Sequence, residues 1–437
     1  MTPAPAGTAP AARRRVAFAE AVRQRRLPNG AELYVLENRF NPTLALSGSL
    51  FAGHLFAPAG RRMVAAVTAG ELSKGTARRS KLQIAEELES RAASLSFACD
   101  ASDPVGLDIG GAALSRDLDL LLDLLAEILR EPVFPEEELE KEKKRLAGAI
   151  RQQQDQTSAR AYEAAMRRIY PKGHPFHRLP GEERIAIVES LTREELDRHY
   201  SERYGAATLK LTLVGDVDAE QVLERLEARF GTWRAGPAGD IPAPPPPPAA
   251  PGEEVVRMPD KASADVVLAL PSTLTRTDPE YVACVLANSA LGQSSLTSRL
   301  GVRVRDTEGL TYGIHSSFTA THLPGPFVVG LTVRPDSRDA AVAATLDEVV
   351  RFRKDGVTDR ELADEKSSRV GKFKVDLASN AGIANALDSA VYYGLGVEYL
   401  DRFPSLVEAV TREEANAAFA RRVDPASFTV VSAGSFP

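Results

Sequence analysis

The amino-acid sequence predicts an α+β protein built from two homologous domains, each a mostly antiparallel sheet with helices packed on one face. Three observations support this prediction. The chain has 437 residues, enough for two to four domains with buried cores. A proline-rich stretch divides it near the middle, and the segments that close the two parts resemble each other. In both parts strands are followed by runs of helices, which is typical of a sheet with helices on one face.

The dividing stretch is residues 234–252, RAGPAGDIPAPPPPPAAPG. Proline has no backbone N–H and a fixed φ, so this stretch can form neither a helix nor a central strand, and we expect an extended spacer. The expected organisation is an N-terminal extension over 1–26, a first domain over 27–233, the linker over 234–252, and a second domain over 253–437.

An internal repeat joins the ends of the two parts. The first closes with LTREELDRHYSERYGAATLKLTLVGD and the second with VTREEANAAFARRVDPASFTVVSAGS. One gapless register aligns Thr192 with Thr411 and Gly215 with Gly434. Each copy has a threonine suited to cap a helix, acidic residues in the first turn, an amphipathic helix, and an apolar strand that ends in glycine. Chance similarity does not account for the whole window, so we expect two domains related by a pseudo-twofold axis.

Hydrophobic periodicity and turn residues set the expected elements. In the first part, strands are expected over 31–38, 42–53, 94–102 and 105–114. Helices are expected over 61–72, 80–93, 116–130 and 135–170, the last with a break near Asp155. In the second part, a strand over 265–271, a helix over 279–291 and a strand over 325–335 repeat the theme.

Composition and charge exclude several classes of protein. A net charge of −6 argues against a nucleic-acid binder that holds phosphates by excess positive charge. Cys99 and Cys284 cannot form a disulfide framework and lack metal-ligand spacing, so we expect buried small residues. No stretch approaches the roughly 20 consecutive apolar residues of a membrane span, and the arginine-rich N-terminus lacks a signal-peptide core. We expect a soluble cytoplasmic protein, with a periplasmic location open if a signal peptide was removed.

Common catalytic motifs are missing from the sequence. It has no Gly-x-Ser-x-Gly elbow or dinucleotide fingerprint, and the turn after Gly292 lacks the lysine of a phosphate-binding loop. His174 and His177 stand near acidic residues in the sequence, so they are candidate metal ligands. An i, i+3 pair outside a helix has no fixed geometry, however, and we expect a structural role. The remaining histidines, which are isolated in the sequence, are His54, His199, His315 and His322.

Four segments, spread over nearly the whole chain, point to one family. Three lie in the first part: SKGTARRSKLQIAEELES, FPEEELEKEKKRL and VGDVDAEQV. The fourth, LGQSSLTSRLGVRVRDTEGLTYGIHSSF, contains Arg305 and Tyr312, seven residues apart. Together they resemble the insulinase/pitrilysin-type zinc metallopeptidases, whose zinc helix carries H-x-x-E-H. The likeness is greatest to the dimeric subfamily that includes mitochondrial processing peptidase subunits. The fourth segment resembles that family's glycine-rich turn, SRL segment and arginine–tyrosine pair.

The resemblance also identifies a departure from the family. It places the zinc helix at MVAAVTAGEL. The first histidine, the glutamate base, the second histidine and the distal glutamate then fall on Ala66, Ala69, Gly70 and Ala149. Catalytic zinc needs about three N, O or S donor ligands and an open position for water, and these residues supply no lone pair. Glu71 is near, but one residue along a helix it is rotated by about 100°. We therefore expect no metal and no other cofactor in this chain.

The retained pair and the lost ligands together predict a non-catalytic subunit of a bacterial heterodimeric zinc metalloendopeptidase, inactive alone. The resemblance implies that a homologous zinc-bearing chain brings the metal. In trans, Arg305 would position a peptide substrate and Tyr312 would donate a hydrogen bond to the oxyanion. Gly292 and Gly309 are the expected substrate-binding glycines. The alternative for the pair is structural: Arg305 pairs with an acid such as Glu308, and Tyr312 packs in the core.

A second hypothesis comes from another class of protein. Core-type subunits of respiratory complexes resemble these peptidases without cleaving peptides, so this chain could be a structural or peptide-binding module with no proteolytic role. A neighbouring gene with an intact H-x-x-E-H would favour the peptidase. Under either hypothesis we expect no nucleic-acid partner and no membrane span.

Overall fold

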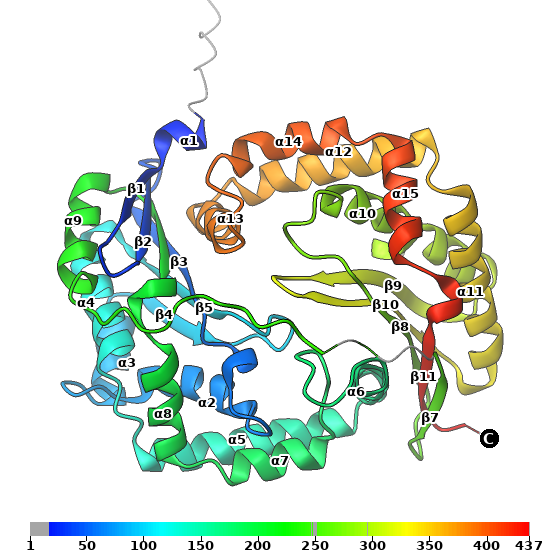
Figure 1. Ribbon diagram of the computed structural model, residues 1–437, viewed down its shortest axis with the longest axis horizontal. Coiled ribbons are helices and arrows are strands. Elements are labelled where there is room, and N and C mark those ends of the chain that lie inside the picture. Colours follow the sequence, from blue (N-terminus) through cyan, green and yellow to red (C-terminus); the bar gives the residue numbers. More distant parts are fainter. Residues whose placement is uncertain (1–16, 246, 248–250, 295, 437) are drawn as a thin grey trace, which may run out of the picture.

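The computed structural model describes residues 17–245, 247, 251–294 and 296–436, and it contains one sheet in each half of the chain (Figure 1). The first sheet has the strand order β1-β2-β6-β3-β5-β4 and the second has β7-β11-β8-β10-β9. Apart from β1, the two orders match strand for strand. In each sheet one corresponding pair is parallel, β2 with β6 and β7 with β11. The predicted fold class, with its internal duplication, is confirmed.

The first half follows the expected order of elements. Its strands are β1 (Arg23–Arg26), β2 (Glu32–Glu37), β3 (Thr43–Leu50), β4 (Ser94–Ala98), β5 (Leu107–Leu114) and β6 (Lys210–Gly215). Its α-helices are α1 (Phe18–Ala21), α2 (Met63–Glu71), α3 (Lys81–Glu89), α4 (Leu118–Arg130), α5 (Glu136–Gln154), α6 (Thr157–Ile169), α7 (Gly181–Glu189), α8 (Arg193–Arg203) and α9 (Ala219–Phe230). Short 3-10 turns are η1 (His54–Phe56), η2 (Leu72–Lys74), η3 (Ser115–Asp117) and η4 (Ala206–Thr208). The expected break near Asp155 separates α5 from α6. The end of the expected N-terminal extension forms β1, and residues 1–16 lie outside the described residues.

The second half repeats these elements. Its strands are β7 (Glu253–Arg257), β8 (Ala264–Pro271), β9 (Thr311–Ala320), β10 (Pro324–Val333) and β11 (Thr429–Gly434). Its α-helices are α10 (Tyr281–Asn288), α11 (Arg338–Asp355), α12 (Asp359–Asp376), α13 (Asn380–Tyr392), α14 (Tyr399–Ala409) and α15 (Arg412–Arg422). Two π-helical segments, η5 (Ser289–Gln293) and η6 (Gly301–Thr307), follow α10, and the 3-10 turns are η7 (Pro335–Ser337) and η8 (Pro425–Ser427). In the part of the chain that the structure describes, no helix is both long enough and apolar enough to cross a membrane.

The repeated segment occupies equivalent places in the two halves. Thr192 and Thr411 precede α8 and α15, and each forms a capping box with the glutamate three residues later. Gly215 and Gly434 end β6 and β11. A Cβ would lie 2.4 Å from a backbone oxygen of β3 at Gly215, and 2.9 Å from a backbone Cα of β8 at Gly434. Both positions need glycine for the same reason, so the sequence repeat corresponds to a structural one.

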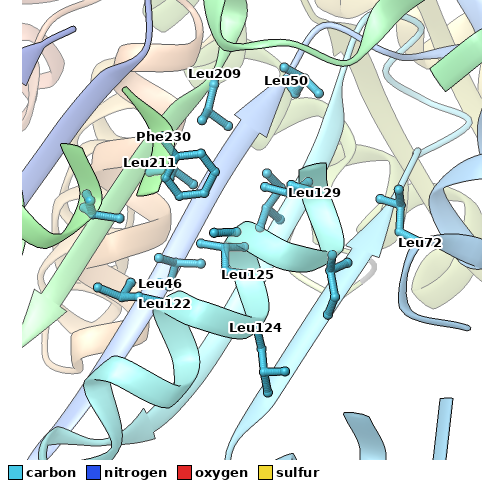
Figure 2. Packing of buried hydrophobic residues seen from close by; sticks show 14 of the residues in the cluster. Leu46, Leu50, Leu72, Leu122, Leu124, Leu125, Leu129, Leu209, Leu211 and Phe230 are labelled. Carbon is cyan, nitrogen blue, oxygen red and sulfur yellow. The ribbon is translucent and has the colours of Figure 1, made fainter. Parts of the chain in front are cut away.

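The main core of the first half lies between its sheet and the helices α4 and α9. Leu46 of β3 and Leu211 of β6 point to this side and pack with Leu122 and Leu125 of α4 and Phe230 of α9 (Figure 2). All five side chains are buried. Burial of a side chain of this size stabilises a fold by roughly 1.5–3 kcal/mol, so this layer fixes the sheet on which α2 rests.

The opposite face of each sheet is covered by a helix from the other half. α6 packs on β8 and β11, and α13 packs on β3 and β6 (Figure 1). Thr157 at the start of α6 donates a hydrogen bond to Asp265 of β8 at 2.5 Å. Asn380 at the start of α13 donates one to the Thr43 carbonyl of β3 at 3.0 Å. The sequence predicted helices on one face only, because helical periodicity indicates a buried side without naming the sheet that buries it.

Candidate functional site

The predicted zinc helix is α2, which packs beside α5. Ala69 is buried within it, and Ala66 and Gly70 are half-buried; Ala149 is half-buried on α5. Three methyl groups and a hydrogen atom stand where a zinc site needs N, O or S donors, so these residues do not fit the metal. Elsewhere in the described ranges, no group of three or more His, Cys, Asp or Glu side chains could hold a metal ion.

Two carboxylates lie close to this position without forming a ligand set. Glu142 of α5 has its Oε1 3.5 Å from where a Cβ on Gly70 would stand, and its Oε2 accepts a hydrogen bond from Arg145 at 2.7 Å. Glu71 is fully buried, and neither of its carboxylate oxygens has a hydrogen-bond partner among the described residues. Burial raises the pKa of Glu71 to about 7. The hydroxyl of Thr68, one turn earlier, is also buried without a described partner.

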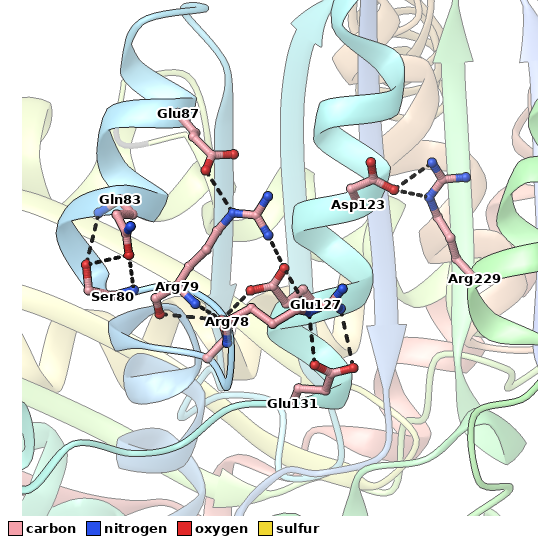
Figure 3. A network of polar contacts seen from close by, with 10 residues as sticks. Arg78, Arg79, Ser80, Gln83, Glu87, Asp123, Glu127, Glu131 and Arg229 are labelled. Atoms are coloured by element: carbon pink, nitrogen blue, oxygen red, sulfur yellow. Dashed lines mark hydrogen bonds and ion pairs between the residues drawn. The ribbon is translucent and has the colours of Figure 1, made fainter.

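The segment that follows α2 is anchored by a buried glutamate (Figure 3). Glu127 of α4 accepts a hydrogen bond from the Thr76 hydroxyl and forms ion pairs with Arg78 and Arg79. Arg79 also pairs with Glu87 of α3 at 2.8 Å. A buried carboxylate is tolerated only when it is paired and hydrogen-bonded in this way. The motif after the zinc helix therefore has a structural role here, because it ties α2 and α3 to α4.

Arg305 and Tyr312 lie on neighbouring elements at the edge of the second sheet. Arg305 belongs to η6, which packs against the edge strand β9, and Tyr312 is in β9 itself. Tyr312 is 70% exposed, and its hydroxyl has no partner among the residues that the structure describes. The side chain of Arg305 is 34% exposed and lies 3.2 Å from Asp306. Glu308 pairs instead with Arg303, at 3.1 Å.

These contacts match one part of the structural alternative for the pair and not the other: Arg305 pairs with an acid, Asp306, but Tyr312 does not pack in the core. That alternative required Tyr312 in the core and Arg305 paired with an acid such as Glu308. The tyrosine is instead one of the most exposed large side chains in the described chain. Among the described residues, the acid that pairs with Arg305 is its sequence neighbour Asp306, and the arginine side chain remains 34% exposed.

The backbone around this pair is irregular. The two π-helical segments η5 and η6 lie on either side of the turn that the sequence identified. Gly292 is buried in η5, and a Cβ there would lie 2.4 Å from the Ser316 hydroxyl. Gly309 follows η6 with φ +63°, a left-handed conformation that favours glycine. Segments of π-helix are rare and often occur at functional sites. Sequence reasoning missed them, and the only signal was the spacing of the glycines.

The histidine pair holds a loop together. His177 Nδ1 lies 2.8 Å from the Tyr170 carbonyl, and the His174 ring stacks on Tyr170 with ring centres 4.1 Å apart. Arg62 donates hydrogen bonds to the carbonyls of His174 and Pro175 at 2.9 and 3.2 Å. Burial lowers the pKa of both histidines. These contacts support the structural role expected from the sequence.

The two cysteines are free thiols. Cys284 is buried and Cys99 is half-buried, and burial raises the pKa of each to about 12. Neither thiol is activated, because a reactive cysteine needs a lowered pKa and access to solvent. The candidate site of this chain is therefore the exposed pair Arg305 and Tyr312, within the second half.

Comparison with known families identifies two matching models. The model described as "Insulinase (Peptidase family M16)" matches residues 71–178, and that described as "Peptidase M16 inactive domain" matches residues 190–369. Together they cover about two thirds of the chain. The first match begins at the end of α2, and the second contains the whole segment from η5 to β9.

Individual relatives agree with these matches. An uncharacterized zinc protease of Streptomyces coelicolor is 25% identical over 330 residues, which cover 72% of this chain and 68% of that protein. A protein of Helicobacter pylori named a non-peptidase homolog is 22% identical over 348 residues, covering 79% of this chain and 78% of its own. The crystal structure of a peptidase M16 inactive domain from Pseudomonas fluorescens superposes with a TM-score of 0.86 at 26% identity, over 95% of this chain and 98% of that one.

Proposed function

This chain is a non-catalytic member of the M16, or insulinase, family of peptidases, and from that premise we propose that it is one subunit of a two-chain zinc peptidase. In this proposal a homologous partner chain brings the zinc ion and the general base. This chain brings Arg305 and Tyr312, and peptide is cleaved only when both chains are present.

The observation that carries the proposal is the state of Tyr312. An exposed tyrosine whose hydroxyl has no partner among the described residues keeps one strong hydrogen-bond donor available. A free donor aimed at solvent contributes nothing to folding, whereas a donor aimed at a developing oxyanion stabilises the transition state. The irregular η5 and η6 segments around it support the same proposal, because irregular backbone is common at functional sites.

Arg305 has a different part in this proposal. Its guanidinium carries a permanent charge and is only loosely held by Asp306 at 3.2 Å. It can therefore turn to a carbonyl or carboxylate of a bound peptide in the ground state as well as in the transition state. Tyr312, in contrast, acts where negative charge develops during the reaction.

The test uses the complex of this chain with a homologous zinc-bearing subunit, assayed on a mixed peptide library. Tyr312→Phe removes one phenolic donor and should lower kcat by about 10²–10³-fold, the usual effect of losing one oxyanion donor, with the complex intact. Arg305→Ala should raise KM and lower kcat together, because it acts in both states. Native mass spectrometry should show unchanged assembly for both.

Matched controls are available in the same half. Arg360 on α12 is 92% exposed, so Arg360→Ala removes a surface arginine away from η6 and should leave both kinetic constants unchanged. If Tyr312→Phe and Arg305→Ala also keep full activity in an intact complex, the half-site proposal is wrong. The structural or peptide-binding subunit then becomes the better description.

A further inference from the structure

α6 and α13 each cover the sheet of the other half, and we call them the exchanged helices. They rest on sheet faces of different chemistry. Under α6, Val267 of β8 lies opposite Val431 of β11, and Ala269 of β8 lies opposite Val328 of β10. All four side chains are buried in one apolar cluster with α6. The contact between α6 and the second sheet is therefore an ordinary hydrophobic one.

The equivalent positions under α13 are polar. Ser47 of β3 lies opposite Thr212 of β6, and Ser49 of β3 lies opposite Asp108 of β5. Ser47, Ser49 and Thr212 are buried, and the hydroxyl of Thr212 has no hydrogen-bond partner among the described residues. The strand orders of the two sheets match, so four apolar side chains in one face correspond to four polar ones in the other.

The helices differ in the same way at their centres. The ninth residue of α6 is Ala165 and the ninth of α13 is Asp388; both are buried. The Ser49 hydroxyl donates a hydrogen bond to Asp388 at 3.3 Å. An aspartate is thus buried between a helix and a sheet at the place where the other half has a methyl group.

Charged groups on the neighbouring strands do not neutralise this aspartate. Lys210 of β6 acts on Asp388 only through its charge, because its ammonium group pairs with Glu32 of β2 at 2.6 Å. Tyr34 of β2 donates its hydroxyl to Glu32 as well, at 2.8 Å. The nearest carboxylate on β5 is Asp108, which has the same sign as Asp388. An ionised Asp388 is therefore buried without an ion-pair partner of its own in the described structure.

The C-terminal end of α13 is held by a second polar contact. Tyr392 donates its hydroxyl to Asp103, in the loop between β4 and β5, at 2.8 Å. The ring of His322, in the turn between β9 and β10, packs edge-on against Tyr392 with centres 4.6 Å apart. Burial lowers the pKa of His322, so this histidine is neutral at pH 7 and supplies no positive charge to the contact.

From this arrangement we propose that α13 is the releasable one of the two exchanged helices, and that a proton on Asp388 controls its docking on the first sheet. A protonated carboxyl between Ser47 and Ser49 is neutral and satisfies its hydrogen bonds there. An ionised carboxylate at the same place is desolvated without an ion-pair partner. Ionisation therefore destabilises the docked state relative to the released state, in which water hydrates the carboxylate. The acids at α6 differ, because each has partners: Asp265 of β8 accepts hydrogen bonds from Thr157 and Thr332. Glu163 of α6 forms ion pairs with Arg184 and Arg167, so α6 stays docked.

The direction of the pH effect follows from the folded state. Burial raises the pKa of Asp388 to about 7 and that of Asp108 to about 6. In the released state Asp388 is in water and titrates near pH 4. Docking is thus strongest below about pH 4, weakens as the pH rises, and reaches a constant lower level above about pH 7.

Hydrogen exchange measured by mass spectrometry on the full chain tests this without a partner subunit. Protection factors are compared between peptides from α13 and from α6, from pH 5 to pH 8. Between pH 5 and 7 the opening constant of α13 should rise by up to tenfold per pH unit, about a hundredfold in all, while that of α6 stays flat. Asp388→Asn should make the opening constant of α13 independent of pH as well. Asp376→Asn, which changes a half-exposed acid at the end of α12, should behave as wild type.

Two results would overturn the proposal: equal pH slopes for α6 and α13, or an unchanged slope in Asp388→Asn. If Asp388→Asn does not fold, Ser49→Ala takes its place. It removes a donor that favours the ionised carboxylate, so the midpoint of the α13 transition should move to higher pH. An unmoved midpoint in Ser49→Ala would equally count against Asp388 as the controlling group.

Discussion

α2 and α10 hold equivalent places in the two halves, and they have diverged in opposite ways. α2 follows β3 as a regular helix, with alanine and glycine at the ligand positions that the sequence resemblance implies and an anchored segment after it. α10 follows β8, the counterpart of β3, and continues into two π-helical segments that carry an exposed arginine and tyrosine. The first half thus has alanine and glycine where the backbone is regular and packed, and the second half has exposed polar side chains where it is irregular.

This contrast separates stability from function within one fold. In the first half, the polar groups near α2 are buried. Glu127 has hydrogen-bond and ion-pair partners, whereas Glu71 has no described hydrogen-bond partner. In the second half, Glu348 of α11 is buried like Glu127, but Tyr312 is exposed and Arg305 is half-exposed. Variants that act on one half but not on its counterpart therefore test whether stability and function are divided between the two halves.

The largest effect is expected from restoring the zinc ligands. The variant Ala66→His, Ala69→Glu, Gly70→His and Ala149→Glu supplies three donors and a base on α2 and α5. Among the described residues, a Cβ at Gly70 would meet only the Glu142 carboxylate, at an ordinary 3.5 Å, so a side chain can begin there without a clash. We expect the variant to bind one zinc per chain, measured by elemental analysis after gel filtration, and wild type to bind none.

The control for this experiment keeps α2 restored but leaves Ala149 unchanged. With one ligand fewer, its zinc should be removed by a much weaker chelator. If wild-type chain alone carries one tightly bound zinc, or cleaves peptides in a chelator-sensitive way, the site lies elsewhere and the contrast between α2 and α10 fails.

The next largest effect concerns one buried glutamate on each of two corresponding helices, α4 and α11. Glu127 of α4 anchors Arg78 and Arg79, and Glu348 of α11 anchors Arg303 at 3.2 Å. Replacing either by glutamine should lower the free energy of unfolding by about 2–3 kcal/mol, because the charge partners lose a buried carboxylate. Urea denaturation measures both.

The two variants should differ in activity. Arg303 lies two residues before Arg305 in η6, so Glu348→Gln should also lower turnover of the two-chain complex. Glu127→Gln, which acts on the anchored half, should leave turnover unchanged once the protein is folded. Equal losses of turnover would show that the two halves do not divide stability and function.

Sequence reasoning could recover most of this architecture, because its signals are local. Proline marked the linker, TREE marked the capped helices, and Gly215 and Gly434 marked strand ends where a Cβ would meet backbone. Each of these features depends on residues that are close together in the chain or aligned by the repeat.

The parts that could not be predicted depend on distant contacts. The exchange of α6 and α13 between halves is invisible in helical periodicity, which is the same whichever sheet lies beneath. Burial of Asp388 depends on the face of β3 and β6, more than 150 residues earlier in the chain. The exposure of Tyr312 likewise depends on β9 being an edge strand, which the sheet order alone reveals.

A smaller effect, of opposite sign, is expected at Glu71. Its carboxylate is buried without a described partner, so Glu71→Met should stabilise the chain by about 1–3 kcal/mol at pH 8. The pKa of Glu71 is raised to about 7, so the wild type loses stability as the pH rises from about 4.5 to about 7. The gain should therefore be small at pH 5 and full at pH 8, as measured by thermal unfolding. A gain that is equal at both pH values would mean that Glu71 is ionised with a partner in solution.

The smallest effect tests the repeat itself. Thr192 and Thr411 each cap a helix in a capping box, with Glu195 and Glu414 three residues later. Thr192→Ala and Thr411→Ala should each lower the free energy of unfolding by about 1 kcal/mol, because each removes one cap from an otherwise equivalent helix. Thr→Ser at either position keeps the hydroxyl and should restore most of the loss. Urea denaturation of the four variants measures the effects in parallel. If one alanine variant costs nothing while the other costs the full amount, the two caps share a sequence but no longer share a role. The divergence seen at α2 and α10 then extends to the elements that have kept the repeat most clearly.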